Sequence, residues 1–245
     1  MFVGILTIKP NRKIAMKLKN QVSHNLKIPL HLIHVFVFPP ESKKEDIDRG
    51  ISLNHQHIIR TAYQQNYKYV MVFEDDVVFY NDTYRRNHKS NHSLFLKAWN
   101  EKDSIKNWEA LFLGGFNAGI NYHVTPHLCR GIRTFGAHGY ILNRRSMKKV
   151  LERDFSKIKN FLTFEASLNQ FDIAVLSALR GYQVAPFILY QYKIPRLIRF
   201  VDKFFNFDNG QYESFLYKWT NMLWLFVISL ILVGVYGILK WRNFI

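Results

Sequence analysis

The chain has 245 residues, of which 48% are hydrophobic, and its formal net charge is +16. This length suits one α/β domain with a small appendage. The single cysteine, Cys129, excludes an intramolecular disulfide framework and a zinc site built from cysteines. A surface this basic attracts polyanions, namely nucleic acid, anionic lipid or nucleotide diphosphates, although a solvated basic face explains the charge more simply. The basic residues are scattered and form no nucleic-acid-binding motif, so no specific nucleic-acid partner is predicted.

Strands and helices are predicted to alternate in the first third of the chain. The apolar residues 1–8 and 32–38 favour strands, and the second of these ends at a Pro-Pro pair. Apolar residues at helical spacing predict helices at 11–26 and 42–66. This alternation is typical of a parallel, doubly wound sheet flanked by helices. In such a sheet, ligands bind beyond the carboxyl ends of the strands.

Three consecutive carboxylates, Glu74, Asp75 and Asp76, follow the apolar residues 69–73, which favour a buried strand. The residues after them, 77–80, are apolar again. A carboxylate cluster in such surroundings has a desolvation and repulsion cost that a divalent cation, usually Mg²⁺ or Mn²⁺, can offset. On an extended chain, Glu74 and Asp76 would point to the same face of the sheet. The alternative is that the three acids cap a helix or face water.

The pattern is less regular after residue 80. Residues 81–107 are polar and favour a loop with a short helix at 93–99. Strands are then predicted at 108–113, within 135–143 and at 182–189, and helices at 144–153 and 172–180.

The last part of the chain differs in composition. Residues 219–239 contain no charge and are long enough to span a bilayer, with tryptophans and basic residues near both ends. A buried core helix is the alternative. Residues 195–206 resemble a basic interfacial helix, or an ordinary helix of the domain. The chain thus divides into a domain at 1–192, a basic amphipathic segment at 193–217, a transmembrane helix at 218–240 and a short tail at 241–245.

Six sequence blocks, in order, resemble glycosyltransferase family 25, which includes lipooligosaccharide and procollagen galactosyltransferases. The spacing of Glu74 and Asp76 is that of the metal-binding DxD motif of GT-A glycosyltransferases. The chain departs from the family pattern at two places. Asn54 stands where the family has the serine of a Ser-His pair, and Lys193-Ile194-Pro195 replace the family's serine-rich segment. The matching blocks are ISLNHQHIIRTAY, VMVFEDDVVF, ALFLGGF, GAHGYILNRRSMKKVL, FDIAVLSAL and PFILYQ.

The resemblance implies a GT-A fold (a Rossmann-like nucleotide-diphospho-sugar transferase sheet) and a membrane-anchored, metal-dependent hexosyltransferase. It would move galactose or glucose from a UDP-sugar donor to a glycan, lipooligosaccharide or protein hydroxyl acceptor, with inversion. Under it, Glu74 and Asp76 bind Mn²⁺ or Mg²⁺, and Asp172 and Asp76 are catalytic. The implied donor-binding residues are Glu74, Asp75, Asp76, His138 and Arg12, the last on chain position only.

Several alternatives remain open at this point. Asp172 is also a good helix N-cap, and His138 and His55 are also typical core histidines. The domain could be an inactive GT-A-like membrane-tethered binding or scaffold module, or a metal-dependent nuclease or phosphatase. No signal peptide is predicted, so we expect a single-pass C-terminal membrane anchor with the catalytic domain in the cytosol. Glycosylation at the sequons of Asn81 and Asn91 would indicate the opposite orientation.

Overall fold

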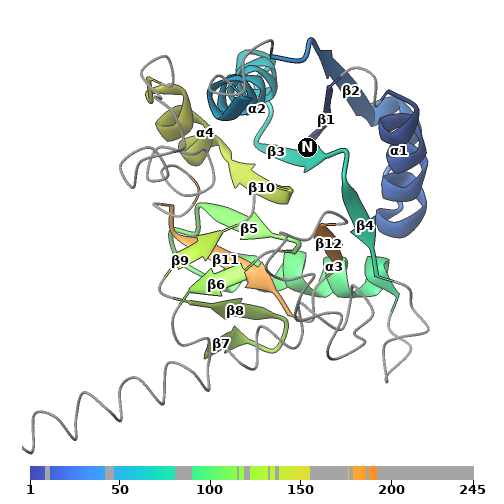
Figure 1. Cartoon of the computed structure of the whole chain (residues 1–245). Helices are drawn as coiled ribbons and strands as arrows, with labels where there is room; N and C mark the ends of the chain where they lie inside the picture. The colour runs from blue at the N-terminus through green and yellow to red at the C-terminus, as the bar shows by residue number, and fades with distance from the viewer. Residues whose placement is uncertain are drawn as a thin grey trace, which may run out of the picture.

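The centre of the fold is an eight-stranded mixed sheet with the strand order β2-β1-β3-β10-β5-β11-β8-β7 (Figure 1). The structure is a computed structural model. The structure describes residues 1–8, 12–41, 47–80, 90–114, 116–118, 122–131, 133–135, 138–154, 176, 179–185 and 188–191.

The first three strands of this sheet are parallel. Strand β1 (Phe2–Ile8) lies between β2 (Ile33–Phe38) and β3 (Tyr69–Glu74) and pairs in parallel with both. Helix α1 (Arg12–Leu26) and a short 3-10 turn, η1 (Leu30–Leu32), connect β1 to β2. Helix α2 (Ile47–Gln64) precedes β3. The predicted alternation of strand and helix is therefore confirmed for this part of the chain.

The rest of the sheet is mixed, so the prediction of a parallel doubly wound sheet is wrong beyond β3. Strand β10 (Gly139–Asn143) runs antiparallel to both β3 and β5 (Ala110–Phe112), and β11 (Gly181–Val184) is parallel to β5. Strand β8 (Leu128–Arg130) pairs antiparallel with β11, and the edge strand β7 (Tyr122–Thr125) pairs antiparallel with β8. Between β5 and β10 the described residues form short strands and no crossover helix, the element that usually joins parallel neighbours.

Two small sheets lie beside the main one. Strand β4 (Val77–Phe79) pairs with β12 (Leu189–Gln191), and β6 (Phe116–Ala118) pairs with β9 (Arg133–Phe135), each antiparallel. The strands β6 to β9 are three or four residues long, and the sequence pattern did not predict them. Such short segments show too few alternations to be recognised.

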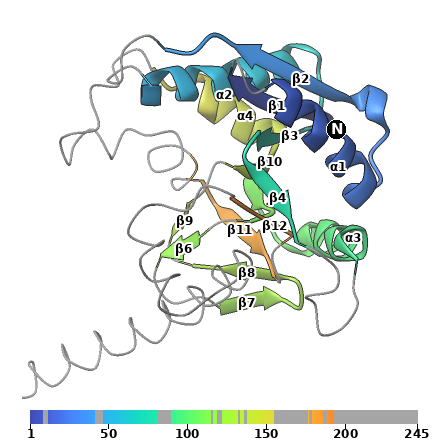
Figure 2. The same ribbon diagram turned by 45° about the vertical axis from the view of Figure 1, so that its right-hand side comes forward.

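Helices cover both faces of the main sheet and bury two separate apolar clusters. On one face, α1 and α3 (Asn91–Glu101), which is followed by the 3-10 turn η4 (Lys102–Ser104), pack against Met71 and Phe73 of β3. On the other face, α2 and α4 (Arg144–Leu151) pack against Val70 and Val72 of the same strand. Figure 2 shows α2 beside α4 on their face of the sheet. Strand β3 is apolar on both faces because helices cover both.

Asn91 is one of the two sequon asparagines, and it is buried in this structure. It is 1% exposed, and its amide donates to Asn25 Oδ1 at 2.7 Å and to the Tyr80 carbonyl at 2.9 Å. In the folded chain this amide is not accessible to a glycosylating enzyme, so a glycan on Asn91 would have to be added before the chain folds. Asn81 lies outside the described residues.

No helix within the described ranges is long and apolar enough to cross a membrane. The transmembrane helix predicted at 218–240, the juxtamembrane segment at 193–217 and the tail at 241–245 lie outside those ranges. They therefore stay predictions.

Candidate functional site

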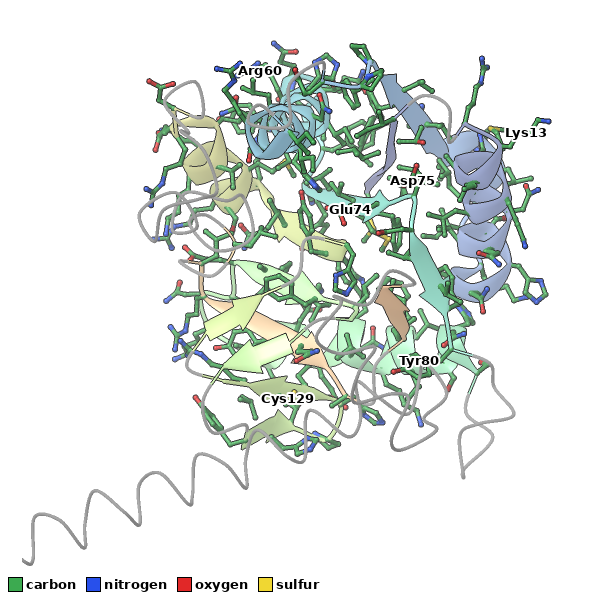
Figure 3. All side chains as sticks on the ribbon, in the orientation of Figure 1. Lys13, Arg60, Glu74, Asp75, Tyr80 and Cys129 are labelled. Carbon is green, nitrogen blue, oxygen red and sulfur yellow. The ribbon has the colours of Figure 1, made fainter. Side chains whose placement is uncertain are left out.

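The acidic residues lie at the carboxyl edge of the parallel strands. Leu6 of β1 is in register with Glu74, which is the last residue of β3. Asp75 and Asp76 then form a turn, and β4 begins at Val77. Figure 3 shows Glu74 and Asp75 at this strand end, between the strands and the helices that flank them. The edge predicted to bind ligand therefore carries the three carboxylates.

Glu74 points toward the α2 face and is held by a buried histidine. His55 Nε2 of α2 lies 3.1 Å from Glu74 Oε1, and His55 Nδ1 lies 3.0 Å from the hydroxyl of Tyr140. The side chain of His55 is completely buried, whereas that of Glu74 is 20% exposed. The three side chains form a hydrogen-bonded chain from β10 through α2 to the edge of the sheet.

This chain of contacts keeps Glu74 ionised. Burial by itself raises the pKa of the Glu74 carboxyl, but the hydrogen bond and charge of His55, together with His138, outweigh it and lower the pKa. Burial raises the pKa of Tyr140 well above its usual range, and the negative charge of Glu74 adds to the effect. Tyr140 therefore stays a neutral hydroxyl, and Glu74 presents a fixed negative charge at the edge.

Asp75 is oriented toward the other face. Its Oδ2 accepts a hydrogen bond of 2.5 Å from the hydroxyl of Thr7, which is fully buried near the end of β1. Alternate residues of a strand share one face, so Thr7 lies on the same face of β1 as Val3 and Ile5, which pack in the apolar cluster beneath α1. Adjacent carboxylates thus leave the strand end in opposite directions, and each is fixed by a different neighbouring element.

The extended-chain argument for Glu74 and Asp76 does not apply. The extended backbone ends at Glu74, and Asp76 lies in the turn, so the alternation of β3 does not determine where its side chain points. The turn redirects the chain because β4 leaves the main sheet to pair with β12.

The described residues also bear on the predicted cation. Among them, no three His, Cys, Asp or Glu side chains are grouped so as to hold a metal ion. Mg²⁺ in phosphate-handling enzymes commonly binds through one or two carboxylates, with phosphate oxygens and water as the other ligands. The acidic turn therefore fits a cation that binds together with a diphosphate, and the described residues alone do not supply a full set of protein ligands.

His138 flanks Glu74 from the neighbouring strand. Its carbonyl accepts a hydrogen bond of 3.1 Å from the backbone amide of Glu74, and the residue is 6% exposed. Burial lowers the pKa of its imidazole, and the nearby charge of Glu74 only partly opposes this. Its Nε2 is buried and accepts or donates no hydrogen bond within the described part of the chain. His138 is thus a neutral, polar group beside the acidic edge, and its predicted role in donor binding stays a prediction.

The remaining predicted site residues are not all brought to this place. Arg12 is the first residue of α1 and is exposed, without a described contact to the acidic turn. Asp172 lies outside the described residues, so its predicted role is untested. Sequence reasoning did not find Thr7 or Tyr140, because a threonine and a tyrosine within apolar strands look like ordinary core residues. His55 was expected to be structural, and it is buried, but it also contacts the acidic edge directly.

Neither a protein-family model nor a curated protein sequence matches this chain. Solved structures with a similar fold include known glycosyltransferases. A glycosyltransferase involved in glycosylation of the major capsid of PBCV-1 has a TM-score of 0.44 at 11% identity, covering 84% of this chain and 100% of that one. The protein A197 from STIV has a TM-score of 0.43 at 10% identity, and the match covers 79% of this chain and 87% of that one. The third is a Drosophila β-1,4-galactosyltransferase 7 mutant in complex with manganese, UDP-Gal and xylobiose. Its TM-score is 0.41 at 13% identity, and the match covers 81% of this chain and 74% of that one.

At these TM-scores and identities, the likenesses define neither a family nor an activity for this chain. The structure itself defines the class: a mixed α/β protein in which the parallel strand β3 ends at three consecutive carboxylates, with Glu74 and Asp75 held by hydrogen bonds.

Proposed function

We propose that the chain is a metal-dependent glycosyltransferase of the GT-A type, related to family 25, that uses a UDP-sugar donor. The transferred sugar is a hexose, with galactose or glucose favoured, and the acceptor is a hydroxyl of a glycan, lipooligosaccharide or protein. The observation that supports this best is the acidic edge, where Glu74 and Asp75 are fixed in opposite directions at the carboxyl end of β3.

Three described residues have a chemical role toward the donor in this proposal. Glu74, kept anionic by His55, accepts hydrogen bonds from hydroxyl groups of the donor. His138 lines the donor pocket with a polar nitrogen that has no hydrogen bond to another described residue. Arg12, exposed at the start of α1, approaches the diphosphate as a fixed positive charge.

A divalent cation belongs to this site when the donor is bound. Mn²⁺ or Mg²⁺ would neutralise the negative charge that develops on the leaving diphosphate. Glu74 and Asp76 are the ligands that the DxD-like spacing assigns to it. Glu74 already accepts from His55 through Oε1, so its other oxygen, Oε2, is the one available to a cation or a donor hydroxyl.

The acceptor side of the site depends on Asp172. A transfer with inversion needs a base that takes the proton of the attacking hydroxyl, and a carboxylate can do this. Asp172 is proposed as that base or as a substrate ligand. We further propose that residues 218–240 anchor the protein in a membrane, with the domain at 1–192 in the cytosol and the basic segment at 193–217 beside the bilayer.

A donor screen tests the activity. The purified full chain is incubated with individual UDP-sugars and Mn²⁺, and the release of UDP is measured with and without a chelator. We expect release with one or a few hexose donors, and loss of release when the chelator is present. Asp76→Asn should abolish release while leaving the circular dichroism spectrum unchanged.

Glu152→Gln is a matched control, because it also removes one carboxylate charge, from an exposed residue at the end of α4. It should retain full activity. Donor binding without turnover for every UDP-sugar would instead favour the inactive binding or scaffold module. Normal turnover of Asp76→Asn with Mn²⁺ present would show that the acidic turn is not the metal site.

A further inference from the structure

The first forty residues of the chain are basic and contain no acid. They include six lysine and arginine residues and no aspartate or glutamate, and the first carboxylate is Glu41. Most of this charge lies on α1 and just after it. The basic residues are Lys9, Arg12, Lys13, Lys17, Lys19 and Lys27.

The charge of α1 lies on its outer face and is not neutralised by the domain. Ala15, Leu18, Val22 and Leu26 form the buried face of the helix. Lys13 and Lys17 are exposed on the opposite side, and neither is in an ion pair with any residue that the structure describes. In Figure 3, Lys13 projects away from the molecule, and Figure 1 shows α1 as an outer layer of the fold.

Large apolar side chains of α1 and η1 are exposed as well. Ile14 and Met16 of α1 are 52% and 45% exposed, and Leu30 and Leu32 of η1 are 47% and 38% exposed. Four of the nine exposed large hydrophobic residues found in the described chain thus fall within 19 consecutive positions. Lysines together with exposed apolar side chains on one helix and the turn after it are the composition of a face that lies at a membrane surface.

We propose that this surface, formed by α1 and η1, docks on an anionic lipid bilayer. Lysines attract the negative surface of such a bilayer, and apolar side chains between them gain by entering the boundary between headgroups and acyl chains. Nucleic acid is the other polyanion that a basic face attracts, but phosphate contacts give no reason for exposed Ile14, Met16, Leu30 and Leu32. Apart from Arg12, no residue of this surface has a role in the proposed donor site, so the proposal does not depend on the proposed function.

Docking through α1 would also set the position of the acidic edge. Strand β1 ends at Ile8 and α1 begins at Arg12, so the helix starts close to the carboxyl edge of the sheet. With α1 lying on the bilayer, the edge would lie near the end of the docked helix at Arg12. A molecule bound there is then held near the membrane, whatever its chemistry.

A fluorescent probe on α1 tests the proposal in the full chain. Met16→Cys is labelled with an environment-sensitive thiol dye, since the native Cys129 is fully buried. The protein is reconstituted into vesicles of phosphatidylcholine alone or of phosphatidylcholine with phosphatidylserine. We expect a blue shift, and quenching by nitroxide-labelled lipid, only in the anionic vesicles. The same dye on Leu96→Cys, an exposed apolar site of α3, should not respond.

Charge variants separate specific docking from general attraction. Lys13→Gln with Lys17→Gln should weaken the docking equilibrium on the order of 25-fold, since each lysine near an anionic surface contributes about fivefold. Arg145→Gln with Lys148→Gln removes the same charge from exposed positions of α4 and should leave docking unchanged. An equal response in neutral and anionic vesicles, or no response in either, would overturn the proposal. The proposal would also be overturned if the dye responded to a mixed-sequence oligonucleotide and not to lipid, and if Lys13→Gln with Lys17→Gln abolished that response.

Discussion

The hydroxyl of Tyr140 is the inner end of the chain of contacts that holds Glu74, and removing it is a sharp test of that arrangement. Tyr140→Phe keeps the ring but leaves His55 Nδ1 without the partner it has at 3.0 Å. Both residues are completely buried, so water cannot replace the lost hydroxyl. A buried polar group that loses its hydrogen bond costs about 1–3 kcal/mol of stability. With a urea m-value of about 1–3 kcal/mol/M, the unfolding midpoint should fall by about 1 M.

Urea unfolding of the solubilised full chain, followed by tryptophan fluorescence, measures this shift. Tyr182→Phe is the control, because Tyr182 is also buried but its hydroxyl has no hydrogen bond to a described residue; its cost should stay below about 0.5 kcal/mol. Glu74→Gln added to Tyr140→Phe should show a coupling of at least about 0.5 kcal/mol, because both act through His55. Equal stabilities of the two tyrosine variants, or additive effects in the double variant, would refute the hydrogen-bonded chain.

Three further predictions concern other parts of the structure. Gly114→Ala should destabilise the fold by more than about 3 kcal/mol, because the added Cβ would lie 2.0 Å from the backbone oxygen of Leu189. In Gly139→Ala the added Cβ meets only the side chain of Leu189, so this variant should lose clearly less stability. Thermal unfolding of both variants measures the difference. The pKa of Glu101 is lowered because hydrogen bonds from Thr125 and His127 outweigh its burial, so its stabilising contribution is present above the unfolded carboxyl pKa of 4.5 and is lost as pH falls through the lower folded pKa. Acid unfolding of Glu101→Gln should therefore show a weaker pH dependence than that of the native chain, and an identical dependence would exclude this contact. Asp172→Asn keeps a good helix cap but removes the charge, so the transfer rate should fall by about 10²-fold or more if Asp172 is the base, whereas an unchanged rate would leave only the capping role.

The sequence predicted the parts of the fold whose signals are local. Strands β1 to β3 and helices α1 and α2 follow from long apolar patterns, and the placement of Glu74 at a strand end follows from the same patterns. The direction of β10 was not predictable, because pairing between strands more than 60 residues apart leaves no periodic trace in either strand.

The site shows the same division between local and distant contacts. The acidic residues were found because three adjacent carboxylates are unusual after a buried strand. The groups that fix them, Thr7, His55 and Tyr140, come from three other elements, and each has a residue type common in protein cores. Only the three-dimensional structure shows that they converge on one strand end.

The position of β10 between β3 and β5 has a consequence for how the protein folds during synthesis. Strands β1, β2 and β3 can pair as soon as the first 74 residues have left the ribosome, and at that stage Glu74 lies on an edge strand. The strand that covers this edge and supplies Tyr140 begins at Gly139, and β12, the partner of β4, begins at Leu189. For the time needed to synthesise these later segments, the nascent chain carries an apolar strand with one unpaired edge, which ends at Glu74 and is followed by two more acids. The three negative charges then discourage the edge from pairing with another nascent chain, so the residues proposed to bind the donor also guard the chain against aggregation before it is complete.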